Sequence, residues 1–82
     1  MPKANQVPDP ALGVVLRRLR EQRGESLEAA AYRAGLTSSS LAAIELERSN
    51  PTWATVRAIA AALDVSLAKL GAAVEAQDSA AP

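Results

Sequence analysis

The sequence predicts an all-α protein built as one small domain, and three observations support this fold class. Nineteen alanines and ten leucines supply most of the apolar content of the 82 residues, while β-branched and aromatic residues are sparse, which favours helix over strand. Apolar residues recur three and four positions apart, as on one face of a helix. Ser, Thr and Asp residues that can cap helices precede these segments. The chain has no Cys, so at this length it must rely on well-packed helices or on a partner.

The first predicted helix starts at Pro10 and stops before Gly24. Asp9 can cap it, and Pro10 suits the first turn because the N–H that proline lacks would have no partner there. Gly24 ends the helix because glycine readily adopts the left-handed conformation. The apolar face of this helix comprises Leu12, Val15, Leu16 and Leu19.

Two short helices follow, one up to residue 34 and one from about residue 38 to residue 45 or beyond. Ser26 can cap the first of these and Gly35 ends it. Thr37 can cap the second, which buries Leu41 and Ile44. The inner face of the first is small, because it is formed by Ala30, Ala31 and Ala34. Tyr32 is expected to pack against the helix that starts at residue 10.

A loop over residues 48–51 separates these helices from the last two. Pro51 disfavours helical geometry at the residue before it, and Thr52 can cap a fourth helix. Its inward residues are predicted to be Trp53, Val56, Ile59, Ala60 and Leu63, with Trp53 as a core anchor. Asp64 and Val65 end it, and Ser66 can cap a fifth helix that carries Leu67, Leu70 and Val74.

The two ends of the chain lack any apolar period. We therefore expect a disordered N-terminal arm over residues 1–8, a folded domain over residues 9–74 and a disordered C-terminal tail over residues 75–82. No apolar stretch resembles a signal peptide or a membrane span. The sequence thus predicts a cytoplasmic protein that does not associate with membranes.

The residue inventory argues against most enzyme classes. The chain has no His and no Cys, so the usual ligands for zinc, haem and iron–sulfur centres are missing, as are thiol and imidazole chemistry. We expect no metal, no cofactor and no enzymatic activity. The formal net charge is zero, but residues 1–23 carry five basic and two acidic side chains, so a basic excess exists only locally.

Residues 27–46 have the spacing of two helices joined by a tight turn. Close approach of such helices needs a small residue on the first, a residue tolerant of positive φ at the turn, and apolar plugs after it. These positions are filled by Ala31, Gly35, Leu36, Leu41 and Ile44. A generic helical hairpin would meet the same requirements, so the spacing alone leaves both interpretations open.

The wider pattern resembles the five-helix DNA-binding domain of the phage repressor, Cro and Xre-like helix-turn-helix family. The resemblance spans Leu12–Val74, about three quarters of the chain, without a gap. It rests on Leu12-Gly13, Leu19-Arg20-Glu21, Gly24-Glu25-Ser26, Ala31, Ala34-Gly35-Leu36-Thr37, Leu41, Ile44-Glu45, Asn50-Pro51-Thr52 and Ala61-Ala62-Leu63-Asp64-Val65-Ser66-Leu67. It implies a compact repressor-like domain whose second and third helices form the helix-turn-helix.

The resemblance also implies which residues would contact double-stranded DNA. In this family the third helix lies in the major groove with its N-terminal residues on base edges. That role maps to Ser38, Ser39 and Ala43, with Thr37 and Ser40 nearer the DNA backbone. Phosphate contacts map to Asn50, Thr52 and the backbone of Trp53. Additional phosphate anchors could be Arg23, Arg33 and Arg48, each of which could equally be a solvated surface charge.

One carboxylate needs a separate explanation, because Glu45 would repel phosphate if it faced DNA. The family pairs this residue with an arginine of the first helix, which implies a largely buried ion pair between Arg20 and Glu45. The chain departs from the family pattern where Leu27, Ser38, Leu46 and Glu47 stand. Glu47 replaces a helix-stopping glycine, so the third helix either runs longer or Glu47 becomes left-handed. Leu27 and Leu46 could be exposed and mark a partner surface.

Two functional hypotheses follow. The favoured one is a homodimeric transcriptional regulator that binds an inverted repeat, since two-fold protein symmetry matches a palindromic operator. Its dimer surface is expected around Leu67, Leu70, Ala73 and Val74, which could instead be ordinary core. The alternative is a module that works chiefly through a protein partner, as an antitoxin or accessory factor. The neutral net charge and the short side chains of the third helix favour this alternative.

Overall fold

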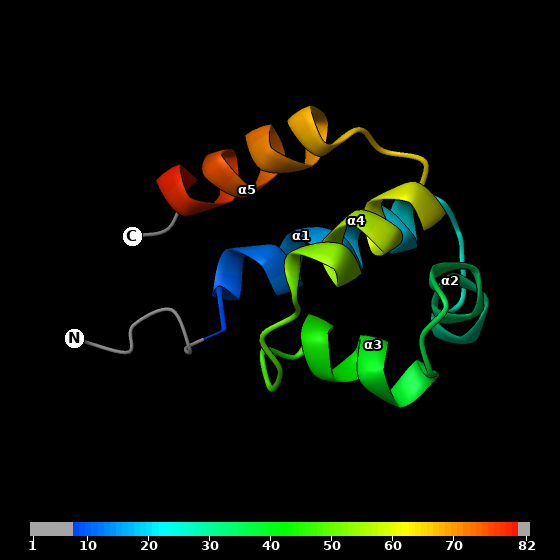
Figure 1. The fold of residues 1–82 in the computed structure, drawn as a ribbon. Coiled ribbons are helices and arrows are strands. Elements are labelled where there is room, and N and C mark those ends of the chain that lie inside the picture. The colour runs from blue at the N-terminus through cyan, green and yellow to red at the C-terminus, as the bar shows by residue number, and fades with distance from the viewer. Residues whose placement is uncertain (1–7, 81–82) are drawn as a thin grey trace.

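The computed structural model describes residues 8–80, and this part of the chain is all-α, as the sequence predicts (Figure 1). Its five helices are α1 (Pro10–Gln22), α2 (Leu27–Ala34), α3 (Ser38–Glu45), α4 (Trp53–Ala62) and α5 (Leu67–Ala80). In Figure 1, α3 and α5 lie at opposite edges of the domain, with α1 and α4 between them. Of the predicted N-terminal arm, residues 1–7 lie outside the described residues.

Every helix begins at the cap that the sequence indicates. In each case a side-chain oxygen accepts a hydrogen bond from a backbone N–H of the first turn, which would otherwise lack a partner. The capping pairs are Asp9 with Ala11 (2.9 Å), Ser26 with Ala29 (3.1 Å), Thr37 with Ser40 (3.0 Å), Thr52 with Thr55 (3.1 Å) and Ser66 with Lys69 (3.0 Å). The element boundaries are therefore set by local chemistry.

The core forms where α1, α2, α3 and α4 meet, and α5 closes it along α1. The most deeply buried large side chains are Val15, Leu16, Leu41 and Ile59. Around them lie Ala30, Ala31, Ile44, Val56, Ala60, Leu63 and Leu70. Helix α2 packs against α3 and α4, while α1 packs against α3 and α5. This arrangement holds α3 by its inner face and leaves its opposite face at the surface.

Gly13 lets α1 approach the end of α3 more closely than any other residue would allow. A Cβ atom at this position would lie 2.7 Å from the carbonyl oxygen of Ile44 and 2.9 Å from that of Glu45. Both obstacles are backbone atoms, which cannot rotate away as a side chain could. The glycine therefore sets the distance between the two helices.

The C-terminal tail is where the predicted boundaries are wrong. The sequence predicts disorder from residue 75, but α5 continues to Ala80, and only residues 81–82 lie outside the described residues. No Gly or Pro interrupts residues 75–80, so a helix already started at Ser66 can propagate. The side chain of Arg18 in α1 also donates a hydrogen bond to the Gln77 side chain over 3.1 Å.

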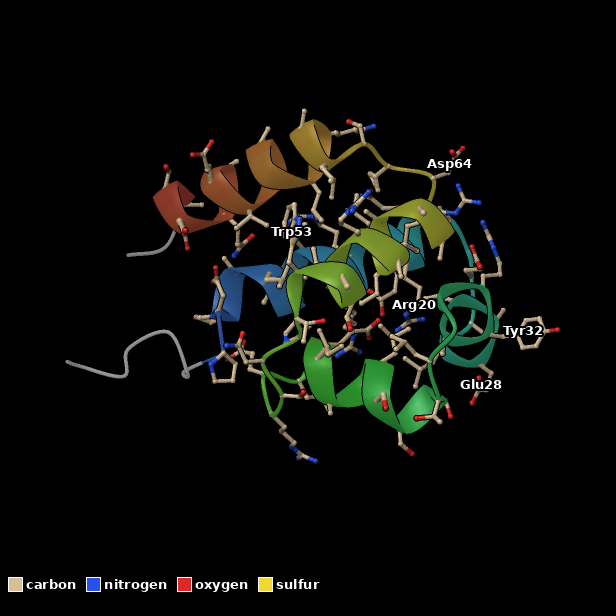
Figure 2. All side chains as sticks on the ribbon, viewed as in Figure 1. Arg20, Glu28, Tyr32, Trp53 and Asp64 are labelled. Carbon is tan, nitrogen blue, oxygen red and sulfur yellow. The ribbon has the colours of Figure 1, made fainter. Side chains whose placement is uncertain are left out.

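Both aromatic side chains are far more exposed than predicted (Figure 2). Trp53 is 65% exposed, and is not a core anchor, because it is the first residue of α4 and the core is filled from Val56 onward. Tyr32 is 86% exposed and points away from the domain. The neighbouring Ala30 and Ala31 face the core, so Tyr32 falls on the opposite side of α2.

The end of α3 shows how the chain manages without the usual glycine. Glu47 adopts a left-handed conformation with φ of 64°, and α3 ends at Glu45. The Arg48 N–H then donates to the Ala43 carbonyl over 2.8 Å, which closes the helix.

The two leucines considered as an exposed partner surface differ in exposure. Leu46 is exposed, whereas Leu27 is half-buried against the core and so does not form part of such a surface.

Candidate nucleic-acid interface

The turn between α2 and α3 has the tight geometry that a helix-turn-helix requires. Gly35 is left-handed with φ of 74°, and its N–H donates to the Tyr32 carbonyl over 3.1 Å. The Leu36 N–H donates to the Ala31 carbonyl over 2.8 Å. Ala31, Leu41 and Ile44 are buried at the crossing. The five predicted motif positions therefore act together to fix α3 against α2.

The first turn of α3 presents short polar side chains. Ser39 and Ser40 are exposed, and Ser38 and Ala43 are half-buried. Thr37 is exposed too, and its hydroxyl both accepts from the Ser40 N–H and donates to the Ser40 hydroxyl over 2.9 Å. Thr37 and Ser40 are thus tied to the cap of α3, while Ser39 has no such tie.

A shallow groove of about 460 Å³ runs between α3 and the segment that enters α4. We call this surface the α3 groove. Its lining residues are Leu36, Ser39, Ser40, Ala43, Ile44, Ser49, Asn50, Pro51, Thr52 and Thr55. The structure therefore brings together Ser39, Ala43, Asn50 and Thr52, which the sequence places up to thirteen positions apart. Ser38, Thr37 and Trp53 do not line it.

Two of the three proposed arginine anchors are engaged within the protein. Arg33 Nη1 lies 2.7 Å from both carboxylate oxygens of Glu25, and Arg23 Nε lies 3.1 Å from one of them. The hydrogen bond from Arg23, together with that from Arg33, lowers the pKa of the Glu25 carboxyl from its ordinary value. Neither arginine lines the α3 groove. Arg48 is exposed beside Ser49, which does line it.

The structure contains the ion pair expected between Arg20 and Glu45. Arg20 Nε and Nη2 donate to the two carboxylate oxygens over 2.8 and 3.0 Å, and the side chains are 13% and 5% exposed. The third nitrogen, Nη1, donates to the Glu25 carbonyl over 3.0 Å. The bonded Glu45 carboxylate raises the pKa of the Arg20 guanidinium above its ordinary value. Glu45 is thus turned away from the α3 groove and ties the end of α3 to α1.

Sequence reasoning missed some of the residues that shape this surface. Ser49, Pro51 and Thr55 line the α3 groove but were not singled out as contacts. Thr55 could have been found from the sequence, because it lies three residues after the cap Thr52. In the structure the hydroxyls of the two residues are 3.0 Å apart. Glu25 could not, since nothing in the pattern shows that it gathers Arg23 and Arg33.

Two further features bear on the kind of site this is. Among residues 8–80, no group of three or more acidic side chains is placed to hold a metal ion. None of the helices in that range is both long and apolar enough to cross a membrane.

Comparison with known proteins gives the same picture as the geometry. The family model described as a helix-turn-helix domain matches residues 11–73. No curated protein matches the sequence. Among solved structures, the restriction-modification controller protein C.AhdI from Aeromonas hydrophila is 31% identical, with a TM-score of 0.72, covering 74% of this chain and 92% of that chain.

A second controller protein is similar in fold at lower sequence identity. Wild-type C.Esp1396I is 21% identical with a TM-score of 0.82, covering 85% of this chain and 91% of its own. The C.Esp1396I tetramer in complex with its natural 35 base-pair operator is 22% identical with a TM-score of 0.80, covering 84% and 90%. The family match spans most of the chain, from α1 into α5. The resemblance to repressor-like regulators is thereby confirmed, and the chain belongs to the helix-turn-helix domain family.

Proposed function

We propose that this protein is a transcription regulator that binds an inverted repeat in double-stranded DNA as a homodimer, with α3 in the major groove. The observation that carries the proposal is the α3 groove. It joins the exposed N-terminal half of α3 to the loop and first turn of α4 on one surface. In helix-turn-helix proteins the second helix of the motif reads bases while neighbouring segments hold the DNA backbone.

Base reading falls to Ser39 and Ala43, with Ser38 at the edge of the same helix turn. A serine hydroxyl can donate to or accept from several base edges, and an alanine methyl can pack on the methyl group of thymine. These are short side chains, so each contact discriminates weakly. Sequence preference must then come from several such contacts and from the shape of the DNA.

Phosphate contacts fall to Asn50, to Thr52 and to the N–H groups at the start of α4. Helix N-termini attract phosphate because their amides lack partners and carry partial positive charge. The same applies to the start of α2 after Ser26. Arg48 adds a full positive charge next to this surface. Such contacts supply affinity and fix the position of α3 without reading sequence.

The similar solved structures support a role in gene control. C.AhdI and C.Esp1396I are restriction-modification controller proteins, and C.Esp1396I is seen as a tetramer on its operator. A single domain covers only one half-site, so a regulator of this size gains specificity by pairing. We therefore infer that this chain too acts as a symmetric oligomer on repeated half-sites.

Selection of bound duplexes from a random DNA pool, at about 100 mM salt where phosphate-driven binding is still appreciable, tests the proposal. Enrichment of an inverted repeat is the expected result, and its spacing gives the distance between the two α3 helices. Failure to enrich any sequence would contradict the proposal. It would favour the alternative, a module that acts mainly through a protein partner, which the zero net charge also favours.

A matched pair of variants locates the DNA surface. Ser39→Glu puts a carboxylate into the α3 groove and should weaken binding to the selected repeat about tenfold or more. Ser79→Glu makes the same change on α5, at an exposed site that does not line the α3 groove. It should leave the affinity unchanged. Equal effects of the two variants would show that α3 does not read the DNA.

A further inference from the structure

The corner between α1 and α2 gathers arginines around one carboxylate. Glu25 lies between the two helices, two positions before the first residue of α2. Arg33 Nη1 lies 2.7 Å from both of its carboxylate oxygens, and Arg23 Nε lies 3.1 Å from one of them. We call these three residues the Glu25 cluster. It holds two positive charges and one negative charge, so its arginines share a single counter-charge.

The acid of this cluster is shielded, whereas its bases face solvent. The side chain of Glu25 is 13% exposed, while those of Arg23 and Arg33 are 38% and 43% exposed. Ion pairs with such exposed arginines contribute little to stability, because water and salt screen them. Glu25 is also fixed through its backbone carbonyl, which accepts a hydrogen bond from Arg20 over 3.0 Å. The arginines can therefore exchange one anion for another, but the carboxylate stays at the corner.

The cluster lies next to a place where phosphate contacts are proposed. Glu25 directly precedes Ser26, which caps α2, and the first N–H groups of that helix are candidates to hold phosphate. In a helix-turn-helix the first helix crosses the DNA backbone while the second enters the major groove. Helix α2 is that first helix here. The charges of the Glu25 cluster are therefore beside the path proposed for the backbone.

We propose that Glu25 competes with DNA phosphate for Arg23 and Arg33, and so limits the affinity of the protein for DNA. The inference rests on the proposed function and deepens it by naming an internal competitor at the same surface. Two carboxylate oxygens in contact with guanidinium groups resemble the oxygens of a phosphate. An arginine that turns toward the DNA leaves a shielded carboxylate without its counter-charge beside a polyanion. Both arginines are thereby withheld from the DNA.

This competition accounts for the state of the arginines that the sequence assigns to phosphate. Arg48 is exposed and forms no ion pair with any of residues 8–80, whereas the other two are bound to Glu25. Neutralising Glu25 should therefore raise the number of arginines that contact phosphate. That number can be measured, because each phosphate contact releases counterions from the DNA.

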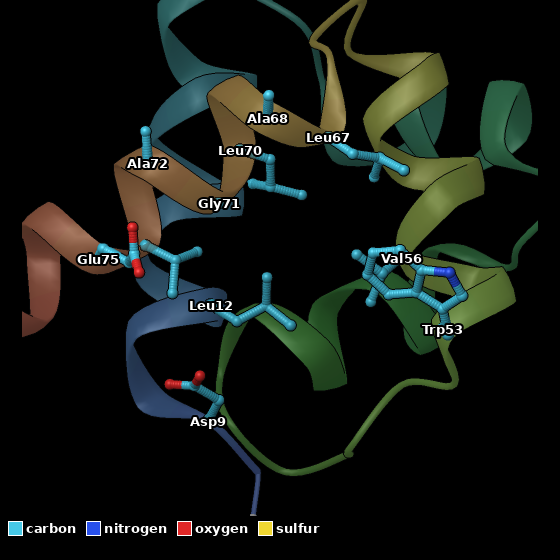
Figure 3. A pocket seen from close by; sticks show the side chains of 11 residues that line it. Asp9, Leu12, Trp53, Val56, Leu67, Ala68, Leu70, Gly71, Ala72 and Glu75 are labelled. Carbon is cyan, nitrogen blue, oxygen red and sulfur yellow. The ribbon is translucent and has the colours of Figure 1, made fainter.

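The Glu25 cluster is separate from the surface expected to pair two copies of the chain. A groove of about 560 Å³ lies between α1, α4 and α5 (Figure 3). Of the residues expected at the dimer surface, Leu67, Leu70 and Val74 line this groove, whereas Ala73 does not. No residue of the Glu25 cluster lines it. Substitutions in the cluster can thus change DNA binding while leaving that groove intact.

The salt dependence of DNA binding tests the proposal. The slope of log Kd against the log of the salt concentration changes by about 0.9 for each phosphate contact. Glu25→Gln should bind duplex DNA more tightly than the wild type, with a slope that is steeper by about one for each arginine released. With both arginines released, its advantage should shrink about tenfold between about 50 and 200 mM salt. An unchanged Kd and slope would overturn the proposal.

Glu28→Gln is the matched control. It removes an exposed carboxylate from the same helix and changes the net charge equally, but Glu28 forms no ion pair with any of residues 8–80. Its effect on Kd should be smaller, and it should not steepen the slope. Equal effects of the two variants would overturn the proposal, because net charge alone would then explain both.

A double-variant cycle assigns the gain to a particular arginine. Arg33→Gln should weaken DNA binding about threefold or more beyond its wild-type effect when Glu25 is also replaced by Gln. The same loss in both backgrounds would show that Glu25 does not withhold this arginine. Thermal melts verify that each variant is folded. Tighter DNA binding by a variant that has lost two ion pairs is not expected if Glu25 only holds the corner together.

Two duplexes separate this inference from the proposed function. Arginine contacts with phosphate do not read sequence, so Glu25→Gln should tighten binding to the selected repeat and to a scrambled duplex of equal length alike. A wild type without sequence preference and a tighter, steeper Glu25→Gln would leave this inference standing and remove the proposed regulator. Enrichment of an inverted repeat with an unchanged Glu25→Gln would do the reverse. Absence of DNA binding by both proteins would overturn both.

Discussion

Among single residues, Arg20 and Glu45 form the ion pair that ties α3 to α1. The pair is nearly buried, and its two direct hydrogen bonds join the end of α3 to α1. The same guanidinium also holds the turn between α1 and α2 through the Glu25 carbonyl. One side chain thereby joins three segments, namely α1, the turn that follows it and the end of α3.

Removing the carboxylate should therefore be costly. Glu45→Ala leaves a guanidinium buried without its counter-charge, and we expect the free energy of unfolding to fall by about 3 kcal/mol. Glu21→Ala removes the exposed partner of Arg17 and should cost at most about 0.5 kcal/mol. Chemical denaturation of the two variants measures both values. Equal losses would mean that the buried pair contributes no more than the surface pair.

Gly13 offers a second test at the scale of single residues. A glycine is required there by the close packing of α1 against α3 and not by its own backbone conformation. Gly13→Ala drives a methyl into the carbonyls of Ile44 and Glu45, and overpacking of this kind costs about 1–3 kcal/mol. Gly71→Ala meets nothing within 4 Å and should stabilise α5 by up to about 1 kcal/mol. Opposite shifts in Tm, measured at low concentration, are expected. A neutral Gly13→Ala would show that α1 and α3 are free to separate.

At the end of α3, replacing the strained residue Glu47 should stabilise the protein, whereas Glu45→Ala and Gly13→Ala should destabilise it. Glu47 is left-handed without a glycine's freedom, which costs about 1–2 kcal/mol. Glu47→Gly should therefore raise the free energy of unfolding by up to about 1 kcal/mol, since glycine also gains disorder in the unfolded chain. Glu47→Ala removes the carboxylate but keeps the Cβ, and it should give no such gain in the same denaturation series.

At the scale of elements, ion pairs to Glu25 hold the corner between α1 and α2. Glu25 receives hydrogen bonds from Arg23, near the end of α1, and from Arg33, near the end of α2. Its three neighbours in this network are all arginines, since Arg20 binds its carbonyl. The corner precedes the helix-turn-helix, so loosening it affects how α2 supports α3.

This corner should respond to acid. Because the pKa of Glu25 is lowered in the folded protein, the fold favours its ionised form. The stability that it contributes is present above the ordinary pKa of 4.5 and is lost as the pH falls through the lowered value. The drop in Tm between pH 6 and pH 3, measured by circular dichroism, should be smaller for Glu25→Gln than for the wild type. Equal drops would show that other carboxylates govern the acid response.

At the scale of the whole molecule, the proposed homodimer should be visible in the stability of the protein. Any partner that binds only the folded state raises Tm in proportion to the logarithm of its concentration. We expect the Tm of the wild type to rise with protein concentration. Calorimetry at several protein concentrations measures this dependence. A constant Tm for the wild type would contradict the dimer.

The fold could be predicted from the sequence because its signals are local. Each helix starts at a capping side chain, and the turn after α2 needs a residue like Gly35. The buried positions of α3, Leu41 and Ile44, could also be predicted, because a helix-turn-helix constrains the spacing of its core residues. Helix ends were harder: α5 runs past residue 75 with no stop signal before Ala80.

What the sequence could not give depends on the direction of side chains in space. Trp53 fits the apolar period of α4, yet it lies in the first turn beyond the edge of the core. Tyr32 directly follows the core residues Ala30 and Ala31, yet it points outward. The charge cluster around Glu25 likewise joins residues whose contact depends on how α1 and α2 meet. Apolar periodicity predicts that a helix has an apolar face, but not how much of that face the neighbouring helices cover.

The division of labour within α3 has a practical consequence for protein engineering. Leu41, Ile44 and Glu45 are buried and hold the helix to the domain, while Ser39 is exposed and Ala43 is half-buried, and both line the α3 groove. Substitutions at surface positions usually change the free energy of unfolding by no more than about 0.5 kcal/mol. A library that varies residues 38, 39 and 43 toward longer side chains could therefore be screened for new operator preferences on a scaffold whose stability stays constant.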